Sequence, residues 1–128
     1  LDLYTGDGGD NSISIFFGNG NGTFGPRNQR SIGSNTYGGH ARDFDGDTIL
    51  DLVVGDFFNG RFHFLRGNGN GTFAAATSWT LIGVDSTAAI SGDFNGDGKL
   101  DVASARGSFD MVGVRYGNGN GTFQAAIN

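Results

Sequence analysis

Oxygen-bearing side chains recur at alternate positions in two short segments of the chain. Residues 43–51 read DFDGDTILD and residues 93–101 read DFNGDGKLD, so positions 1, 3, 5 and 9 carry Asp or Asn in both. Ca²⁺ is a hard cation that takes about six to eight oxygen ligands, and alternate side chains of a tight loop can point to one centre. The pattern therefore predicts two Ca²⁺ sites, each with a backbone carbonyl at position 7.

The two predicted sites differ at position 3, where the first has a carboxylate and the second an amide. The predicted ligands are Asp43, Asp45, Asp47, the carbonyl of Ile49 and Asp51 in the first loop, and Asp93, Asn95, Asp97, the carbonyl of Lys99 and Asp101 in the second. Neither loop is an EF-hand, because the bidentate Glu at position 12 is missing. A polar turn without metal is the alternative, but carboxylates packed this closely would repel one another. Mg²⁺ fits less well because it keeps its waters.

Position 6 also distinguishes the two loops. The second loop has Gly98 there, whereas the first has Thr48. Glycine accepts a positive φ at no steric cost, and a β-branched residue does not. We therefore expect the first site to be distorted or weaker.

A repeat of about 50 residues contains these loops. The heptapeptide GNGNGTF, called the glycine box here, occurs at residues 18–24, 67–73 and 117–123. Leu-Asp pairs recur in step with it, at residues 1–2, 50–51 and 100–101. This period predicts one domain over residues 1–128, made of units 1–49, 50–99 and an incomplete 100–128. Within each box, the Asn-Gly pairs predict a hairpin corner.

The segments around the boxes have the pattern of β-strands. Residues 12–17, 61–66 and 111–116 place apolar side chains at every second position, and residues 50–54 and 100–105 are short apolar runs. Third and fourth strands are expected within 72–82 and 86–93. Four short strands per unit match a propeller blade. The sequence thus predicts an all-β fold, a β-propeller of four-stranded antiparallel blades with about 2.6 blades present.

Composition narrows the class of protein. The chain has 25 Gly, no Glu and one Lys, which disfavours helices. Its net charge of −5 disfavours a nucleic-acid partner. It has no Cys, so disulfides and thiol catalysis are excluded. No apolar run reaches the length of a membrane span, so no membrane insertion is expected.

Other chemistry-bearing residues have simpler interpretations beside their functional ones. No His–Asp–nucleophile set is apparent from the spacing, so we expect no enzyme, and a structural role is expected for both His40 and His63. Trp79 and His63 are candidates for a sugar site, although a lone Trp in a β domain is usually core. Three Asn-Gly-Thr sequons offer possible N-glycosylation or simply turn chemistry, and their asparagines are Asn21, Asn70 and Asn120.

The segments GDFNGDGKLDVASA (92–105) and GNGNGTFQAA (117–126) resemble the FG-GAP/VCBS repeat family, found in integrin α-subunit heads and certain propeller lectins. The resemblance covers the whole chain and points to the Asp and Asn residues already chosen from their spacing. It implies usually about seven blades around an axis, with Ca²⁺ loops between blades. It also implies an extracellular or cell-surface location and a glycan or extracellular protein as partner.

Several functions are compatible with this resemblance. The leading expectation is a non-enzymatic, extracellular, calcium-binding module that acts in binding or adhesion. The alternatives are a lectin with sugar sites between blades, a self-assembling building block, and a non-catalytic part of a larger enzyme. A closed propeller needs about four to eight blades, so further blades of the same chain or a homo-oligomer are expected. Asp2 matches position 9 of another loop, which a missing segment or another chain would complete.

Overall fold

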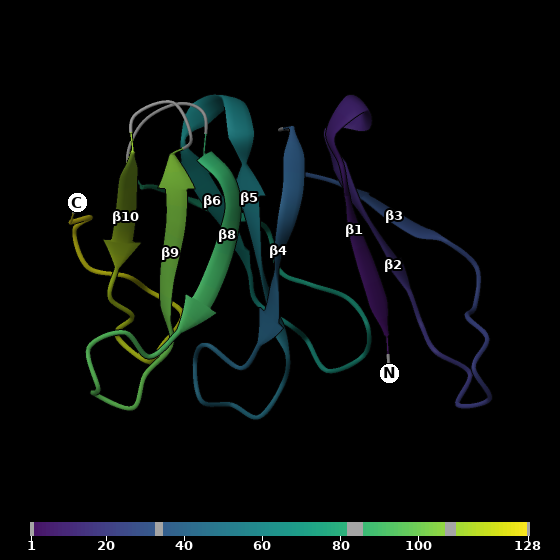
Figure 1. Cartoon of the computed structure of the whole chain (residues 1–128). Coiled ribbons are helices and arrows are strands. Elements are labelled where there is room, and N and C mark those ends of the chain that lie inside the picture. Colours follow the sequence, from purple (N-terminus) through teal and green to yellow (C-terminus); the bar gives the residue numbers. More distant parts are fainter. Residues whose placement is uncertain (1, 33–34, 82–85, 107–109, 128) are drawn as a thin grey trace.

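The computed structural model describes residues 2–32, 35–81, 86–106 and 110–127, which form three antiparallel sheets standing side by side (Figure 1). The all-β prediction is confirmed. The first sheet contains β1 (Leu3–Asp7), β2 (Ser12–Phe16) and β3 (Asn28–Ser31); the second contains β4 (Thr36–Arg42), β5 (Asp51–Asp56), β6 (Arg61–Leu65) and β7 (Thr77–Thr80); the third contains β8 (Ser86–Gly92), β9 (Asp101–Arg106) and β10 (Met111–Arg115). Two 3₁₀ turns, η1 (Gly8–Asp10) and η2 (Phe57–Asn59), complete the described elements. Among these elements there is no helix with the length and hydrophobicity to cross a membrane.

The second sheet is buried on both faces. Successive side chains of a strand point to opposite faces, and in β5 both sets are apolar. Leu52 and Val54 pack with Ile13 of the first sheet, whereas Val53 packs with Val102 of the third. This is why β5 reads as an uninterrupted apolar run, since a strand covered on both sides has no face for water.

Aromatic side chains fill the space between the second and third sheets. Phe62 and Phe64 of β6 point toward the third sheet, together with Phe44 from the Asp-rich loop before β5. Phe123 contacts all three rings in edge-on arrangements. Edge-on contacts between rings add to the stabilisation given by apolar burial, so this cluster is the centre of the core.

The two outer sheets each keep one exposed face. Val112 of β10 occupies the same position in its repeat as Phe62, yet it is exposed where Phe62 is fully buried. Leu3 of β1 corresponds to Leu52 and is likewise exposed. The same alternating pattern therefore gives a buried side chain in the middle sheet and an exposed one in an outer sheet.

The boundaries of the sequence repeat do not coincide with the boundaries of the sheets. The four-stranded sheet takes β4 from the unit 1–49 and its other three strands from the unit 50–99. In the third sheet, Val114 of β10 also pairs with Ile127 through an isolated bridge, which begins a fourth row. The three units remain a description of the sequence, and the second and third sheets each combine strands on both sides of a unit boundary, whereas the strands of the first sheet all lie within unit 1–49.

All three glycine boxes turn the chain at the edge of the molecule where the Asp-rich loops lie, at the bottom of Figure 1. In the first box, Gly18 bridges Phe24, and Gly20 and Gly22 have φ of +79° and +86°. Asn19 N–H also donates to Thr23 O. The predicted hairpin corner is confirmed, and the glycines rather than the asparagines adopt the positive φ.

Candidate metal centre

Each Asp-rich loop connects two neighbouring strands of one sheet. Residues 43–50 join β4 to β5, in which Arg42 lies opposite Asp51, and residues 93–100 join β8 to β9 in the same way. The implied position of these loops between blades is therefore wrong for the sheets of this chain. The reason is the register, because position 9 of each loop already belongs to the strand that pairs with the strand before the loop.

The first Asp of each loop holds the loop in shape. Asp43 Oδ1 accepts the N–H groups of Gly46 and Asp47 at 2.7 and 3.2 Å, and Oδ2 accepts that of Thr48 at 2.8 Å. Partial desolvation acts to raise the pKa of Asp43, but these N–H groups outweigh it and the pKa is lowered. The carboxylate is therefore ionised and fixed in position, as a metal ligand must be.

Asp93 does the same in the second loop, where its oxygens accept N–H groups from Gly96, Asp97 and Gly98 at 2.7, 3.1 and 2.9 Å. Its pKa is lowered chiefly by the Gly98 N–H group. The backbone bonds of the two loops thus match one for one.

Position 9 connects the loop to the glycine box. Asp51 Oδ2 accepts the N–H of Phe44 at 3.0 Å, and Oδ1 accepts that of Gly67 at 2.8 Å. A Cβ on Gly67 would lie 2.3 Å from Leu50 O, so only glycine permits this close approach. The other repeats contain the same bond between position 9 and the first box residue, at Asp101–Gly117 and Asp2–Gly18. Spacing alone identified position 9 as a ligand and missed this second role, although the Leu-Asp pairs and the boxes recur in step.

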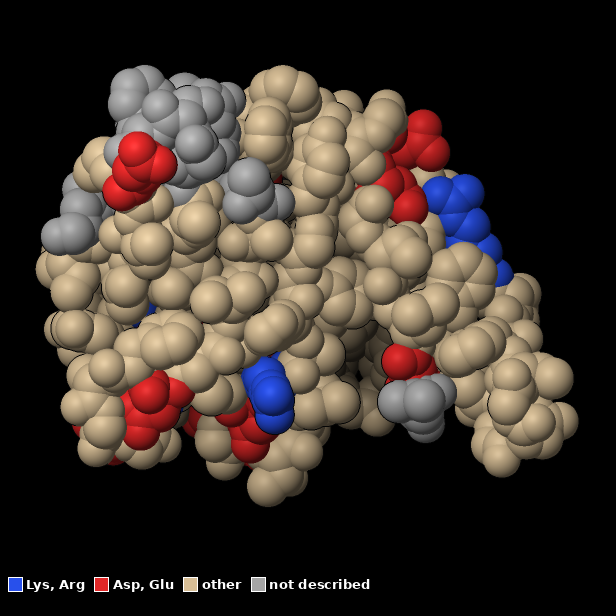
Figure 2. Space-filling model, viewed as in Figure 1, with Lys and Arg blue, Asp and Glu red and all other residues tan. Residues whose placement is uncertain are grey.

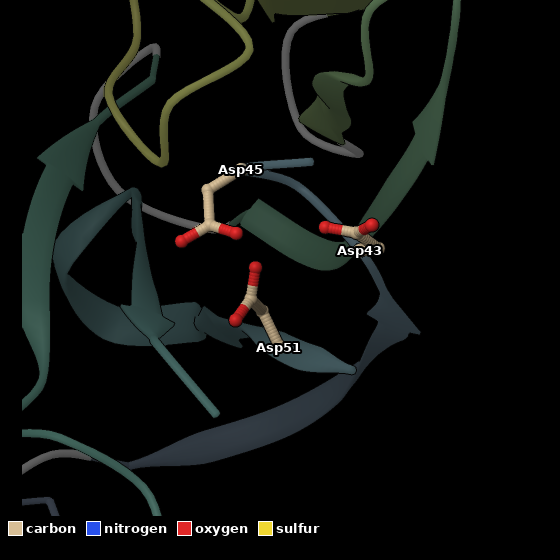
Figure 3. Close-up of side chains that lie close together, drawn as sticks. All are labelled: Asp43, Asp45 and Asp51. Carbon is tan, nitrogen blue, oxygen red and sulfur yellow. The ribbon is translucent and has the colours of Figure 1, made fainter. Parts of the chain in front are cut away.

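Three carboxylates of the first loop converge. Asp43, Asp45 and Asp51 each offer an oxygen, and these oxygens all lie within 4.8 Å of one another (Figure 3). Burial is the main cause of a raised pKa at Asp51, and the charges of Asp45 and Asp47 add to it. Hard oxygen donors at this spacing fit Ca²⁺, and a cation among them would offset the repulsion that opposes ionisation of Asp51.

Asp47 is turned to a different partner. Its Oδ1 accepts the N–H of Ile49 at 2.9 Å, and its Oδ2 lies 3.0 Å from Arg66 Nη2. Arg66 Nε also lies 2.5 Å from Asp45 Oδ2. Figure 2 shows acidic side chains gathered at the lower edge of the molecule, with a basic side chain among them. The structure thus brings together three of the four predicted carboxylates, and it places the Arg66 guanidinium beside the fourth, Asp47, and also beside Asp45 of the three.

The second loop contains one carboxylate fewer than the first, and it also contains Lys99. Asp97 Oδ2 accepts a bond from Asn95 Nδ2 at 3.3 Å and lies 3.9 Å from Lys99 Nζ. Within the described ranges, no trio of acidic, His or Cys side chains other than the one in the first loop converges as tightly. The reason is Asn95, which leaves the second loop without the carboxylate that Asp45 supplies in the first. The ligand roles of Asn95 and of the carbonyls of Ile49 and Lys99 remain predictions.

Thr48 adopts the backbone conformation that glycine adopts in the second loop. Its φ is +70°, against +80° at Gly98. The backbone of the first loop is therefore not distorted, contrary to expectation. The substitution of Thr for Gly at position 6 is instead expected to strain the backbone of the first loop, because a positive φ is energetically unfavourable for a β-branched residue.

The two sugar-site candidates lie on opposite faces of the second sheet. Trp79 pairs with Phe62 in register and His63 pairs with Ser78, so the side chains of Trp79 and His63 point apart. The Trp79 ring lies edge-on to Phe123 at 5.4 Å, with the Arg115 guanidinium 5.6 Å from its centre. The structure does not bring Trp79 and His63 into one site.

The sequon asparagines take part in the turns of the boxes. Asn21 Oδ1 accepts both the N–H and the hydroxyl of Thr23, at 3.1 and 2.7 Å. The other boxes repeat this pair of bonds, from Thr72 to Asn70 and from Thr122 to Asn120. These bonds support the turn interpretation, and glycosylation remains a prediction.

A polar chain that the spacing did not reveal runs from buried Asp56 and His63 to exposed Ser78 in the second sheet. His63 Nε2 lies 3.3 Å from Asp56 Oδ2, and Ser78 Oγ lies 3.0 Å from His63 Nδ1. Asp56 also pairs with Arg61 Nε at 2.8 Å. The sequence spacing showed no His–Asp–nucleophile set, but the structure brings Asp56, His63 and Ser78 together in this order. The imidazole itself is buried, and its contacts within the fold favour a structural role. His40 likewise bonds only within the fold, to Ser91.

Acidification is expected to destabilise the protein through His63. Burial is the main cause of its lowered pKa, which the Asp56 charge partly opposes. The unfolded chain then binds more protons as the pH falls through about 6.5, so stability is lost from about pH 7 downward until the lower folded-state pKa of His63 is passed. Urea unfolding across this range should show a smaller loss for His63→Gln than for the unchanged chain. An NMR titration that gives His63 a pKa above 6.5 would contradict this.

The comparisons with known proteins identify the repeat. The FG-GAP-like repeat matches residues 1–54 and again residues 43–104. The two matches overlap at the first Asp-rich loop, and the second ends within β9. The search of curated proteins gave no match. The matches cover most of the chain, and they contain both Asp-rich loops and the first two glycine boxes. The chain therefore belongs to the FG-GAP-like repeat family.

Proposed function

We propose that this chain is a non-enzymatic, calcium-stabilised β-propeller repeat module that acts outside the cell in binding or adhesion. The observation that carries the proposal is the convergence of Asp43, Asp45 and Asp51 in a loop already ordered by backbone bonds. Family membership and the three adjacent antiparallel sheets support the propeller part of it.

Ca²⁺ is the cation that this donor set suits best. Asp45 and Asp51 are buried or nearly so at their carboxylates, and buried like charges need a partner of opposite charge. One Ca²⁺ in each loop would change the net charge from −5 to −1. The protein would hold the carboxylate oxygens of Asp43 and Asp45, from the loop, close to that of Asp51 in β5. The bound ion would then stiffen the connection between β4 and β5.

The proposed extracellular location rests on the Ca²⁺ affinity that is typical of extracellular modules. Extracellular modules bind Ca²⁺ with dissociation constants of about 10⁻⁴–10⁻³ M, so they fill outside cells and stay largely empty in the cytosol. A propeller stabilised in this way presents a rigid surface to a glycan or an extracellular protein. The proposed function is therefore binding rather than catalysis, in agreement with the burial of His63.

Calcium is expected to raise the melting temperature. At a concentration 10 to 100 times the dissociation constant, each site would contribute about 1–3 kcal/mol to the free energy of unfolding. Thermal unfolding followed by circular dichroism should show a higher Tm in Ca²⁺ than in EGTA. Mg²⁺ is the control and should give a much smaller rise. An equal Tm in Ca²⁺ and EGTA would contradict the calcium role.

Arg66 is expected to weaken calcium binding at the first loop. Its guanidinium already pairs with Asp45 and Asp47, so Ca²⁺ must compete with a cation of the chain itself. Tyr116 occupies the same position in the third repeat, directly after β10, which makes Arg66→Tyr a substitution that the fold already uses. Calorimetric titration should show tighter binding at one site in this variant, by roughly 10-fold for about 1.4 kcal/mol. Unchanged or weaker affinity would show that Arg66 does not compete.

A further inference from the structure

Complementary surfaces join the second sheet to the third. The second sheet contributes Phe44 and Phe62, and the third contributes Val102 and Phe123. The ring centroids of Phe44 and Phe62 lie 6.1 and 5.0 Å from that of Phe123. Only 3% of Phe44 and 6% of Phe123 are exposed. We call the surface on the second sheet the loop half of the contact, and the surface on the third sheet the box half.

Each half occurs once more on an outer sheet. The third sheet carries a second loop half with Phe94 and Val112, and the first sheet carries a second box half with Leu3 and Phe24. All four side chains are exposed, Phe94 by 47% and Phe24 by 45%. Each of these four residues has an equivalent in the internal contact at the repeat spacing. The residues of the internal contact are buried, whereas their four equivalents on the outer sheets are exposed.

The glycine box of the first sheet has space for a loop. In the internal contact, loop 43–50 lies against the box 117–123, where a Cβ on Gly121 would lie 3.7 Å from the Asp45 Cβ. The corresponding box 18–24 instead lines a pocket of about 320 Å³ together with Phe24. The glycine residues that face loop 43–50 in the third box thus have equivalents that line an open pocket in the first box.

We propose that two copies of this chain bind head to tail, with the loop half on the third sheet of one copy against the box half on the first sheet of the next. A second copy is the fitting occupant because one chain carries both exposed halves and also contains the completed contact as a template. Burial of exposed apolar side chains supplies the driving force. The two halves differ, so the contact is heterologous and leaves one free half at each end of a dimer. The contact does not depend on the proposed calcium function.

Sedimentation velocity over a range of concentrations tests this proposal. The unchanged chain should associate beyond its 13.3 kDa monomer as concentration rises. Val112→Arg blocks the loop half and Phe24→Arg blocks the box half, and each variant should lose self-association. Phe58→Arg is the matched control, because Phe58 is exposed but lies in η2 outside both halves. This variant should associate as the unchanged chain does.

Mixing the two blocked variants tests the head-to-tail geometry. The Phe24→Arg chain keeps its loop half and the Val112→Arg chain keeps its box half, so an equimolar mixture should form a dimer and no larger species. This result also shows that both variants are folded. A monomer at every concentration of the unchanged chain would overturn the proposal and leave these faces to another partner or to further repeats. Association that persists in both variants, or a mixture that stays monomeric, would overturn it as well.

Discussion

Replacing Asp51 with Ala is expected to lower the free energy of unfolding by about 3–5 kcal/mol, because two buried N–H groups lose their acceptor. Those groups belong to Phe44 and Gly67, which the Asp51 carboxylate holds at 3.0 and 2.8 Å. Each unsatisfied buried group costs about 1–3 kcal/mol, and the lost side chain leaves space beside the core. Urea unfolding in EGTA measures this structural effect without any contribution from metal.

Two further variants separate the roles of this side chain. Asp2→Ala removes the equivalent residue of the first repeat, which is exposed and, among the described residues, accepts a bond from the Gly18 N–H group. Its cost should stay below about 1 kcal/mol. Asp51→Asn keeps the shape and one acceptor oxygen, so it should retain more stability than Asp51→Ala but lose the rise in Tm given by Ca²⁺. Equal costs for Asp51→Ala and Asp2→Ala would show that the carboxylate does not hold the loop to the box.

Phe123→Ala is expected to cost about 3–5 kcal/mol, the usual range for emptying a buried aromatic position. Phe123 lies at the centre of the contact between the second and third sheets and touches Phe44, Phe62, Phe64 and Trp79 edge-on. Its removal takes a ring from each of these contacts at once. Chemical denaturation should therefore show a lower midpoint with little change in the denaturant slope.

The repeat supplies a matched control for this prediction. Phe24 has the same position in the first glycine box but is exposed, so Phe24→Ala should cost less than about 1 kcal/mol in the monomer. The two substitutions remove the same atoms from the same local sequence. A large cost for Phe24→Ala in dilute monomer, or a small cost for Phe123→Ala, would contradict the described packing.

Much of the fold could be predicted from the repeat and the alternation of side chains. The strands around Ile13, Phe62 and Val112 follow from period two, and the corners follow from the paired glycines. Which of these equivalent positions is buried could not be predicted. Phe62 is covered because the third sheet packs on the face to which it points, whereas Val112 has the same local pattern but no described sheet on its face. Burial depends on the arrangement of sheets, which no single segment encodes.

The candidate site was predictable in its residues but not in their pairing. Spacing selected Asp43, Asp45 and Asp51, which converge as oxygen ligands would. It also selected Asp47, but the structure places Arg66 beside that carboxylate. Arg66 follows Asp47 by 19 residues and reaches it only because β6 pairs with β5. Contacts of this kind depend on strand register, so a motif confined to nine residues does not contain them.

The offset between the boundaries of the repeat and those of the sheets has a consequence for how such a chain can grow. Because β4 pairs with β5 and β8 pairs with β9 across the unit boundaries, each of these two junctions lies in a short loop that joins neighbouring hydrogen-bonded strands of one sheet. Duplication of one unit of DNA would therefore insert a complete sheet, with each new strand finding an equivalent partner from the adjoining unit. Gene duplication and deletion can then change the number of sheets in whole steps, while each junction between units keeps the same ladder of bonds.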